Sequence, residues 1–179
     1  METKKNFTHR LLKVLTLLVI LTVSINANAQ KERLQTAFIY QLTRLIEWCP
    51  EGKQGSFVIA VLGSEQGLIT ELQALNGRSV GSQKIEIKSF SSVSDISSTN
   101  ILFVPDSQFD NVRQITNNLK GGCTLIVSDR SGAAGLGAGV SLVFNQSASK
   151  LEFEINRGYM RRNSLNVNDQ LYNLASKVY

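Results

Sequence analysis

The run FVIAVL, Phe57 to Leu62, is the strongest indication of the fold, because six consecutive apolar residues leave it no polar face. A strand with one solvated face alternates apolar and polar residues, whereas a strand covered on both faces is apolar throughout. Strands of the second kind belong to parallel sheets that are packed between helices. The run therefore predicts a central strand of a layered α/β fold.

Helical spacing is found on both sides of this run. Before it, apolar residues recur three or four positions apart and predict an amphipathic helix over Lys31 to Trp48, which Pro50 ends. After it, a second helix is expected over Glu65 to Leu75, ended by Asn76-Gly77. The order helix, buried strand, helix is typical of α/β chains.

The same alternation continues toward the C-terminus. Short apolar runs predict buried strands at Ile101 to Val104 and Thr124 to Val127, and the helix between them ends at Gly121-Gly122. Apolar residues alternate with charges in Lys84 to Phe90, so we expect a strand there with one solvated face.

The pattern changes in the last third of the chain. Val140 to Phe144 and Leu151 to Ile155 read as two strands joined by a short polar loop, which predicts a hairpin. Helices are expected over Asn156 to Arg162 and after Asn168, a residue suited to a helix N-cap. These elements predict a three-layer α/β sandwich with a largely parallel sheet and an antiparallel C-terminal hairpin.

The first 29 residues have the composition of an export signal. Basic residues precede the apolar run Val14 to Val23, which is too short to cross a bilayer as a helix. Ala27-Asn28-Ala29 supplies the small-x-small pattern that signal peptidase needs, and it places cleavage between Ala29 and Gln30. An uncleaved anchor is the alternative. We therefore expect residues 1–29 to be a signal peptide and residues 30–179 to form one exported domain.

The composition of this expected mature chain argues against several classes of protein. His9, the one histidine, lies in the predicted signal, so the mature chain has no imidazole for a catalytic triad or a histidine-ligated metal. The formal charge of +5 falls to +2 without residues 1–29, because they hold four of the 19 basic and one of the 14 acidic residues. Nucleic-acid binding is therefore not indicated. We expect a protein that is not an enzyme and needs no cofactor.

Six motifs follow one another across nearly the whole mature chain. They are AFIYQLTRLIEWCP (Ala37 to Pro50), FVIAVLG (Phe57 to Gly63), LNGRSVGSQKIEIKSF (Leu75 to Phe90), NILFVP (Asn100 to Pro105), TLIVSD (Thr124 to Asp129) and GVSLVFNQSASKLEFEIN (Gly139 to Asn156). In this order the motifs resemble the YfiR-like family of small periplasmic proteins. The resemblance implies that residues 30–179 are a single YfiR-like domain located in the periplasm.

The resemblance also implies a function. Family members bind and restrain the periplasmic sensor domain of a membrane-bound diguanylate cyclase, so that loss of the regulator raises cyclic-di-GMP and promotes biofilm. They are typically dimeric, which makes a homodimer an expectation here. Other members serve other membrane sensors, including histidine kinases, and the pathway stays open at this point. The alternative is a module that binds a small ligand and feeds a sensor histidine kinase or a transporter.

Cys49 and Cys123 are the only cysteines, and export would bring them into an oxidising compartment. Cys49 closes the first predicted helix and Cys123 opens a predicted strand, so in a parallel sheet both would lie at the same edge. The two cysteines could form a disulfide or remain two separate buried thiols, and the sequence does not decide between these states. YfiR-like proteins are typically redox-sensitive through cysteines, but this property is not carried over, because Cys49 and Cys123 do not fall on the cysteine pairs of the best-known member.

Side chains near the middle and the end of the chain are candidates for a partner or ligand surface. Trp48 offers either an exposed anchor or packing in the core or its rim. Arg157 and Arg161 share one face of a predicted helix and could hold an acidic partner or an anionic ligand, or remain solvated. Glu152 and Glu154 point to one side of a strand, where we expect a solvated face rather than acid/base chemistry.

The stretch SDRSGAAGLGAGVSLVF, Ser128 to Phe144, contains four closely spaced glycines. A dinucleotide-binding loop requires a strand, a glycine turn and then a helix, whereas the run after Gly139 predicts a strand. Phosphate binding is therefore not indicated. The loop lies at the carboxyl edge of the sheet, where ligands of open α/β sheets bind. Gly135 and Gly137 are thus candidates for a partner or ligand surface, and a flexible connection is the alternative.

Overall fold

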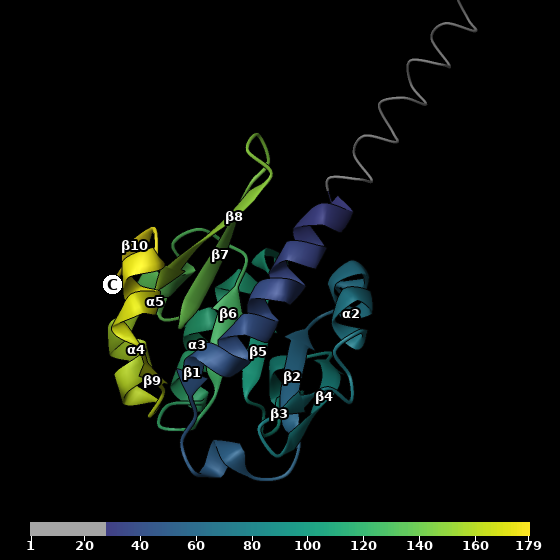
Figure 1. Cartoon of the computed structure of the whole chain (residues 1–179), viewed down its shortest axis with the longest axis vertical. Coiled ribbons are helices and arrows are strands. Elements are labelled where there is room, and N and C mark those ends of the chain that lie inside the picture. The colour runs from purple at the N-terminus through teal and green to yellow at the C-terminus, as the bar shows by residue number, and fades with distance from the viewer. Residues whose placement is uncertain (1–27) are drawn as a thin grey trace, which may run out of the picture.

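The computed structural model describes residues 28–179 (Figure 1). Residues 1–27, which hold most of the predicted signal peptide, lie outside the described residues. The predicted cleavage bond between Ala29 and Gln30 falls within a helix that covers residues 28–45 of the described part, here called the first helix. Within residues 28–179, no helix combines the length and the apolar composition that a membrane span requires.

An eight-stranded sheet forms the middle layer, with strand order β10-β8-β7-β6-β5-β2-β4-β3 (Figure 1). A separate two-stranded antiparallel sheet pairs β1 with β9. The strands are β1 (Ile46–Glu47), β2 (Phe57–Leu62), β3 (Ser79–Val80), β4 (Gln83–Phe90), β5 (Ile101–Val104), β6 (Leu125–Ser128), β7 (Val140–Asn145), β8 (Lys150–Ile155), β9 (Asn166–Val167) and β10 (Lys177–Val178).

The pairing of the strands confirms the predicted fold class. Strand β2 pairs in parallel with β4 on one side and β5 on the other, and the parallel order continues through β6 to β7. Strands β7 and β8 form the predicted antiparallel hairpin. Every residue of β2 is buried, as its uniformly apolar sequence predicts.

Helices cover both faces of this sheet. The chain passes from β2 through α2 to β4 in one direction along the sheet, and from β5 through α3 to β6 in the other. Because such crossovers are right-handed, α2 and α3 lie on opposite faces. The first helix lies on the α2 face, since Arg33 Nε is 3.4 Å from Glu71 Oε1 of α2. The remaining bounds are η1 (Glu51–Lys53), α2 (Gln66–Gln73), η2 (Val93–Asp95), η3 (Asp106–Asn111), α3 (Val112–Asn118), η4 (Ala133–Leu136), α4 (Arg157–Arg162) and α5 (Asp169–Leu174).

The first helix ends three residues earlier than its apolar spacing predicts. It stops at Leu45, whose side chain is 46% exposed, and the next two residues form β1. Ile46 pairs with Val167 of β9, a residue far along the chain, so the pairing that ends the helix is not encoded locally. At the other end, Asn168 caps α5 as predicted, because its side chain accepts a hydrogen bond from the backbone N–H of Gln170 (2.9 Å).

Tyr159 connects α4 to the sheet through a fully buried phenol. Its hydroxyl donates to the backbone oxygen of Thr124 (2.8 Å) and accepts from the backbone N–H of Ile126 (3.3 Å). Gly139 leaves room for the ring, because a Cβ there would lie 2.9 Å from Tyr159 Cδ1. The phenol thus supplies partners for two buried backbone groups at the start of β6.

We expect this phenol to make stability decrease at alkaline pH. Burial raises the pKa of Tyr159 above its ordinary value of 10.0, although the hydrogen bond from Ile126 and the charge of Arg162 lower it in part. The unfolded chain therefore ionises first, and the stabilisation is complete below pH 10 and is lost as pH rises toward the native pKa. Urea unfolding should show a loss of up to about 1.4 kcal/mol per pH unit above pH 10 from this group. Equal pH slopes for the wild type and Y159F would contradict this assignment.

Candidate functional site

The candidate residues fall at two opposite edges of the sheet. The amino edge, where β2, β5 and β6 begin, carries Cys49 and Cys123. The carboxyl edge, where the same strands end, carries the glycine-rich connection from β6 to β7. Each edge is built from segments that are distant in sequence.

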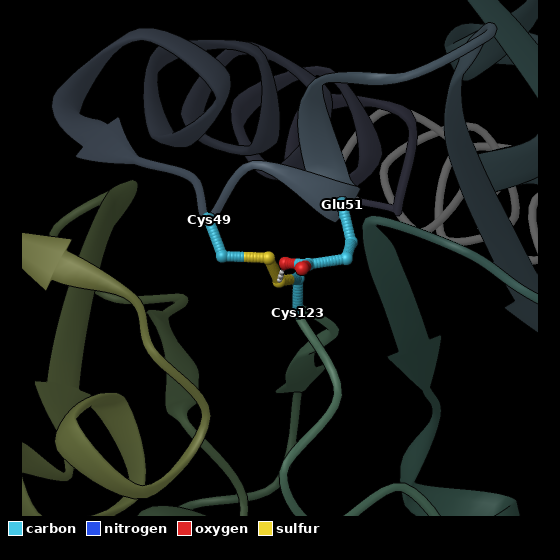
Figure 2. A group of neighbouring side chains, drawn as sticks. All are labelled: Cys49, Glu51 and Cys123. Atoms are coloured by element: carbon cyan, nitrogen blue, oxygen red, sulfur yellow. Dashed lines mark hydrogen bonds between the residues drawn. A yellow bond between two sulfur atoms is a disulfide. The ribbon is translucent and has the colours of Figure 1, made fainter.

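Cys49 and Cys123 lie together at the amino edge and are joined by a disulfide (Figure 2). Their Cα atoms are 6.0 Å apart, although 74 residues separate them in sequence. Cys49 precedes β2 and is 7% exposed, whereas Cys123 lies just before β6. The bond ties the connection between β1 and β2 to the start of β6, the edge at which the parallel topology places both residues.

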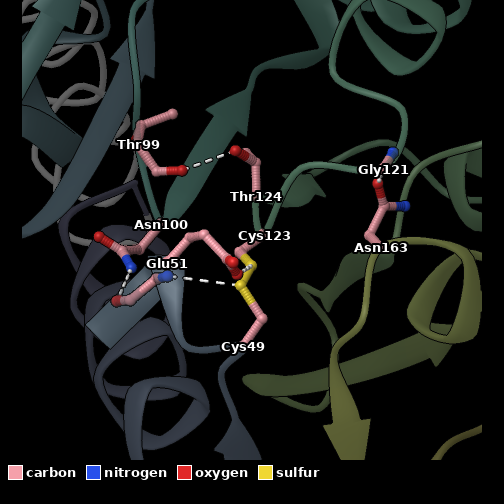
Figure 3. Close-up of a disulfide and its surroundings, with 9 residues drawn as sticks. Cys49, Glu51, Thr99, Asn100, Gly121, Cys123, Thr124 and Asn163 are labelled. Carbon is pink, nitrogen blue, oxygen red and sulfur yellow. Dashed lines mark hydrogen bonds between the residues drawn. A yellow bond between two sulfur atoms is a disulfide. The ribbon is translucent and has the colours of Figure 1, made fainter. Parts of the chain in front are cut away.

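A hydrogen-bond network holds the segment that follows Cys49 (Figure 3). Asn100, at the start of β5, donates through Nδ2 to the backbone oxygen of Gly52 (2.7 Å) and accepts at Oδ1 from the backbone N–H of Val58 (2.9 Å). Gly52 N–H in turn donates to Cys49 Sγ (3.4 Å). One buried amide side chain therefore fixes both the disulfide loop and the first residues of β2.

A polar pocket of about 410 Å³ lies beside the disulfide. Thr99 and Thr124 line it and are bridged, because Thr124 Oγ1 donates to the backbone oxygen of Thr99 (2.6 Å; Figure 3). The pocket is open and most of its walls are backbone turns and small polar side chains; they are Glu51, Gly52, Gln54, Ser56, Val58, Ser98, Thr99, Asn100, Asn118, Leu119, Lys120, Gly122, Cys123 and Thr124.

Glu51 reaches over the disulfide, and its Oε2 is 3.9 Å from Cys123 Sγ (Figure 2). The two cysteine Sγ atoms and a carboxylate oxygen of Glu51 lie within 4.8 Å of one another. Metal ions bind the thiolate form of cysteine, and both sulfurs here are consumed by the disulfide. The group is therefore a covalent crosslink rather than a metal centre while the bond is intact.

Trp48 is not an exposed anchor for a partner. Its side chain is 5% exposed, its ring packs edge-on against Phe57 with centroids 5.0 Å apart, and its Nε1–H donates to the backbone oxygen of Thr43 (3.3 Å). The apolar ring is buried and its polar atom is satisfied, so the packing alternative describes this residue.

The glycine-rich connection is packed rather than open. Gly132 N–H donates to Glu154 Oε2 (2.8 Å), Ala134 N–H donates to Ser141 Oγ (2.7 Å), and Gly137 has a φ of +121° that favours glycine. The expectation of a solvated face is wrong for Glu154, which is 9% exposed because the connection folds over it. The neighbouring Glu152 stays half-exposed, as expected.

Two of the candidate residues, Gly135 and Arg157, meet at Tyr179. A Cβ at Gly135 would lie 2.6 Å from Tyr179 Cε1, and Arg157 N–H donates to the backbone oxygen of Tyr179 (2.9 Å). The Arg157 guanidinium also stacks on the Tyr172 ring, 4.2 Å from its centroid. Arg161 is exposed in the last turn of α4. Four large apolar side chains of η4, α5, β10 and the residue that follows β10 are exposed and are here called the C-terminal surface: Leu136, Leu174, Val178 and Tyr179.

A second pocket, of about 250 Å³, lies at the carboxyl edge and was not predicted. Lys31 of the first helix forms an ion pair with Asp129, which follows β6 (Nζ to Oδ2, 2.7 Å). Gln35 lines the same pocket and is 2% exposed. The signal was present in the sequence, since Gln35 lies one helical turn before Ile39 on the stripe that the helix buries.

The layered sheet, the disulfide at its amino edge and the pocket at its carboxyl edge define the class of the protein: a small α/β domain with a largely parallel sheet. The family model described as YfiR/HmsC-like (DUF4154) matches residues 32–176, so the chain belongs to the YfiR/HmsC-like family. The predicted family is thereby confirmed, and membership suggests a periplasmic regulator. No curated protein matches the sequence significantly.

Two solved structures are similar in fold. One is a conserved domain protein from Vibrio cholerae O1 biovar eltor, with a TM-score of 0.52, 11% identity and coverage of 83% of this chain and 60% of that one. The other is the ABC domain in complex with L-Trp from Streptococcus pneumonia, with a TM-score of 0.48, 13% identity and coverage of 68% and 55%. This chain thus spans little more than half the length of either, and the likeness to the first concerns the fold alone.

Proposed function

We propose that this protein is a periplasmic regulator, exported through a cleaved signal peptide, that binds and restrains the periplasmic sensor domain of a membrane signalling protein. By resemblance that protein is a diguanylate cyclase, so the regulator lowers cyclic-di-GMP and biofilm formation. Membership of the YfiR/HmsC-like family is the observation that carries the proposal. Residues 30–179 act as one domain, as a monomer or a homodimer, by binding rather than by catalysis.

The C-terminal surface is the proposed contact with the membrane protein. Leu174 is 74% exposed, more than the other exposed large apolar side chains of residues 28–179, and β10 is an edge strand of the sheet. Exposed apolar patches mark interaction sites, and tyrosine and arginine are enriched among the residues that dominate binding energy in protein interfaces. Arg157, held on Tyr172, supplies the arginine. An unpaired strand edge also offers backbone groups to a partner.

We expect L174S to abolish regulation without affecting folding. In a deletion strain, the wild-type gene should lower cyclic-di-GMP and biofilm, whereas L174S should fail because its affinity for the membrane protein falls about tenfold or more. The matched control is L45S, which removes another exposed leucine, at the end of the first helix. Circular dichroism of both purified variants checks the fold.

Different outcomes would contradict the proposed surface and the proposed function. Full activity of L174S would overturn the proposed surface. If deletion leaves cyclic-di-GMP and biofilm unchanged, and crosslinking of the tagged mature chain in cells captures no membrane protein, the proposed regulatory function is wrong.

A module that binds a small ligand and feeds a sensor histidine kinase or a transporter is the second candidate. The pocket at the carboxyl edge favours it, because ligands of open α/β sheets bind at this edge. Genes for a kinase or a transporter beside this one, together with unchanged cyclic-di-GMP after deletion, would support this candidate over the first.

A further inference from the structure

The pocket at the carboxyl edge lies where the sheet changes direction. Connections leave β2 and β5 toward opposite ends of the sheet, which opens a crevice outside the carboxyl ends of these two strands. Phe103 of β5 and Leu68 of α2 provide apolar walls. The first helix closes one side with Lys31, Glu32 and Gln35, and Glu65 and Asp129 line the rest. Asn28 also lines the pocket in the full chain but precedes the predicted cleavage bond, so the proposed site does not include it.

Gln35 presents an unsatisfied hydrogen-bond donor in this pocket. The residue is 2% exposed, and its Nε2 has no hydrogen-bond partner among the described residues. Nearly all buried side-chain polar atoms in proteins have a partner, so an unpaired buried amide that lines a pocket points to a missing acceptor. The occupant of the pocket should therefore carry an oxygen acceptor.

The charges of the pocket favour a cationic occupant. Glu32, Glu65 and Asp129 contribute three carboxylates, and Lys31, which contributes the positive charge, is already paired with Asp129 at 2.7 Å. Glu32 lies against Gly67, where an added Cβ would collide with its carboxylate. Burial, followed by the charge of Glu71, raises the pKa of Glu32, because both disfavour its charged form.

The spacing of the carboxylates distinguishes between kinds of cation. Over residues 28–179, Cys49, Glu51 and Cys123 are the group of three in which ligand-type atoms lie within 4.8 Å of one another. Glu32, Glu65 and Asp129 do not form such a group, so they do not converge on a single metal ion. Because Asp129 is already paired with Lys31, Glu32 and Glu65 remain for a cation, which suits an ammonium group with three N–H donors better than a metal ion that takes six or more oxygen ligands.

We propose that this pocket binds a small primary ammonium compound that also carries an oxygen acceptor, such as an amino alcohol or an amino sugar. The ammonium group lies between Glu32 and Glu65, and the oxygen accepts from Gln35 Nε2. A volume of about 250 Å³ admits a molecule no larger than a monosaccharide. The site stands on the geometry of the pocket and does not depend on which membrane protein is bound.

Calorimetric titration and thermal unfolding of the mature chain test this site with matched probes. D-glucosamine and ethanolamine should bind and raise the melting temperature, whereas their neutral counterparts D-glucose and ethylene glycol should not. E65Q should weaken binding of the ammonium probes at least tenfold, because it removes the charge of an exposed residue and keeps its shape. Q35L should likewise weaken the binding of glucosamine and ethanolamine, because it removes the Nε2 donor of Gln35.

The control is E86Q, on the solvated face of β4, which should bind like the wild type. The proposal is overturned if neither ammonium probe binds, if the neutral probes bind equally well, or if E65Q binds as tightly as E86Q. Potassium chloride at the same ionic strength should not change the melting temperature. An equal rise with potassium chloride would mean that the probes act by screening charges and would contradict the proposed site. L174S should bind the probes normally, so failure of the regulatory function and failure of this site are distinguishable.

Discussion

Removal of both cysteines, in C49A/C123A, is expected to lower the free energy of unfolding by about 4 kcal/mol. The disulfide closes a loop between residues 74 positions apart, and in the chain-entropy model a loop of this length restricts the unfolded chain strongly. For a chain of this size, such a loss corresponds to a fall of about 10 °C in the melting temperature. Thermal unfolding of the mature chain, followed by circular dichroism, measures it.

Reduction provides the control for this prediction. A phosphine reductant should lower the melting temperature of the wild type to near that of C49A/C123A and should leave the double variant unchanged. If the non-reduced wild-type protein lacks the two-hydrogen deficit in its mass, or if both proteins melt together, the crosslink does not form or does not stabilise.

N100A is expected to cost about 3 kcal/mol, the second largest effect. The amide of Asn100 is 7% exposed and pairs with Gly52 O (2.7 Å) and Val58 N–H (2.9 Å), so its loss leaves one buried and one partly buried backbone group without a partner. Each such group costs about 1–3 kcal/mol. Urea unfolding of the oxidised protein gives the change in free energy.

The matched control for N100A is N118A. Asn118 lines the same pocket but is exposed, so its replacement should change the free energy of unfolding by less than about 0.5 kcal/mol. Because Asn100 also positions the disulfide loop, N100A should make the disulfide easier to reduce. Equal stabilities of N100A and N118A would show that the buried amide does not hold this edge of the sheet.

The layered fold was predictable because its signals are local. A uniformly apolar run such as Phe57–Leu62 reports burial on both faces without knowledge of its neighbours. The hairpin of β7 and β8 is equally local, since its strands are joined by a short loop. The position of the cysteines at one edge also followed, since both precede parallel strands.

The features that the sequence did not predict depend on distant segments. The first helix ends at Leu45 because Ile46 pairs with Val167, and Glu154 is buried because Gly132 folds over it. The carboxyl-edge pocket, in contrast, has a local signal in the sequence, which is the position of one polar residue. Gln35 sits on an otherwise apolar helical stripe, and a polar residue in such a position indicates a buried amide from the helical spacing alone.

In the glycine-rich connection, the Glu154 carboxylate already accepts a hydrogen bond from Gly132 N–H and would compete with any other anion for it. A free phosphate could reach the Gly132 N–H only by displacing a carboxylate of the same chain that already lies 2.8 Å away. Even a flexible tether holds such a group at an effective concentration on the order of millimolar, and here the competitor is fixed on a buried strand. A loop with the glycine content of a nucleotide-binding site thus has its Gly132 N–H already bound by a side chain of the same protein, and another anion would have to displace that side chain to bind there.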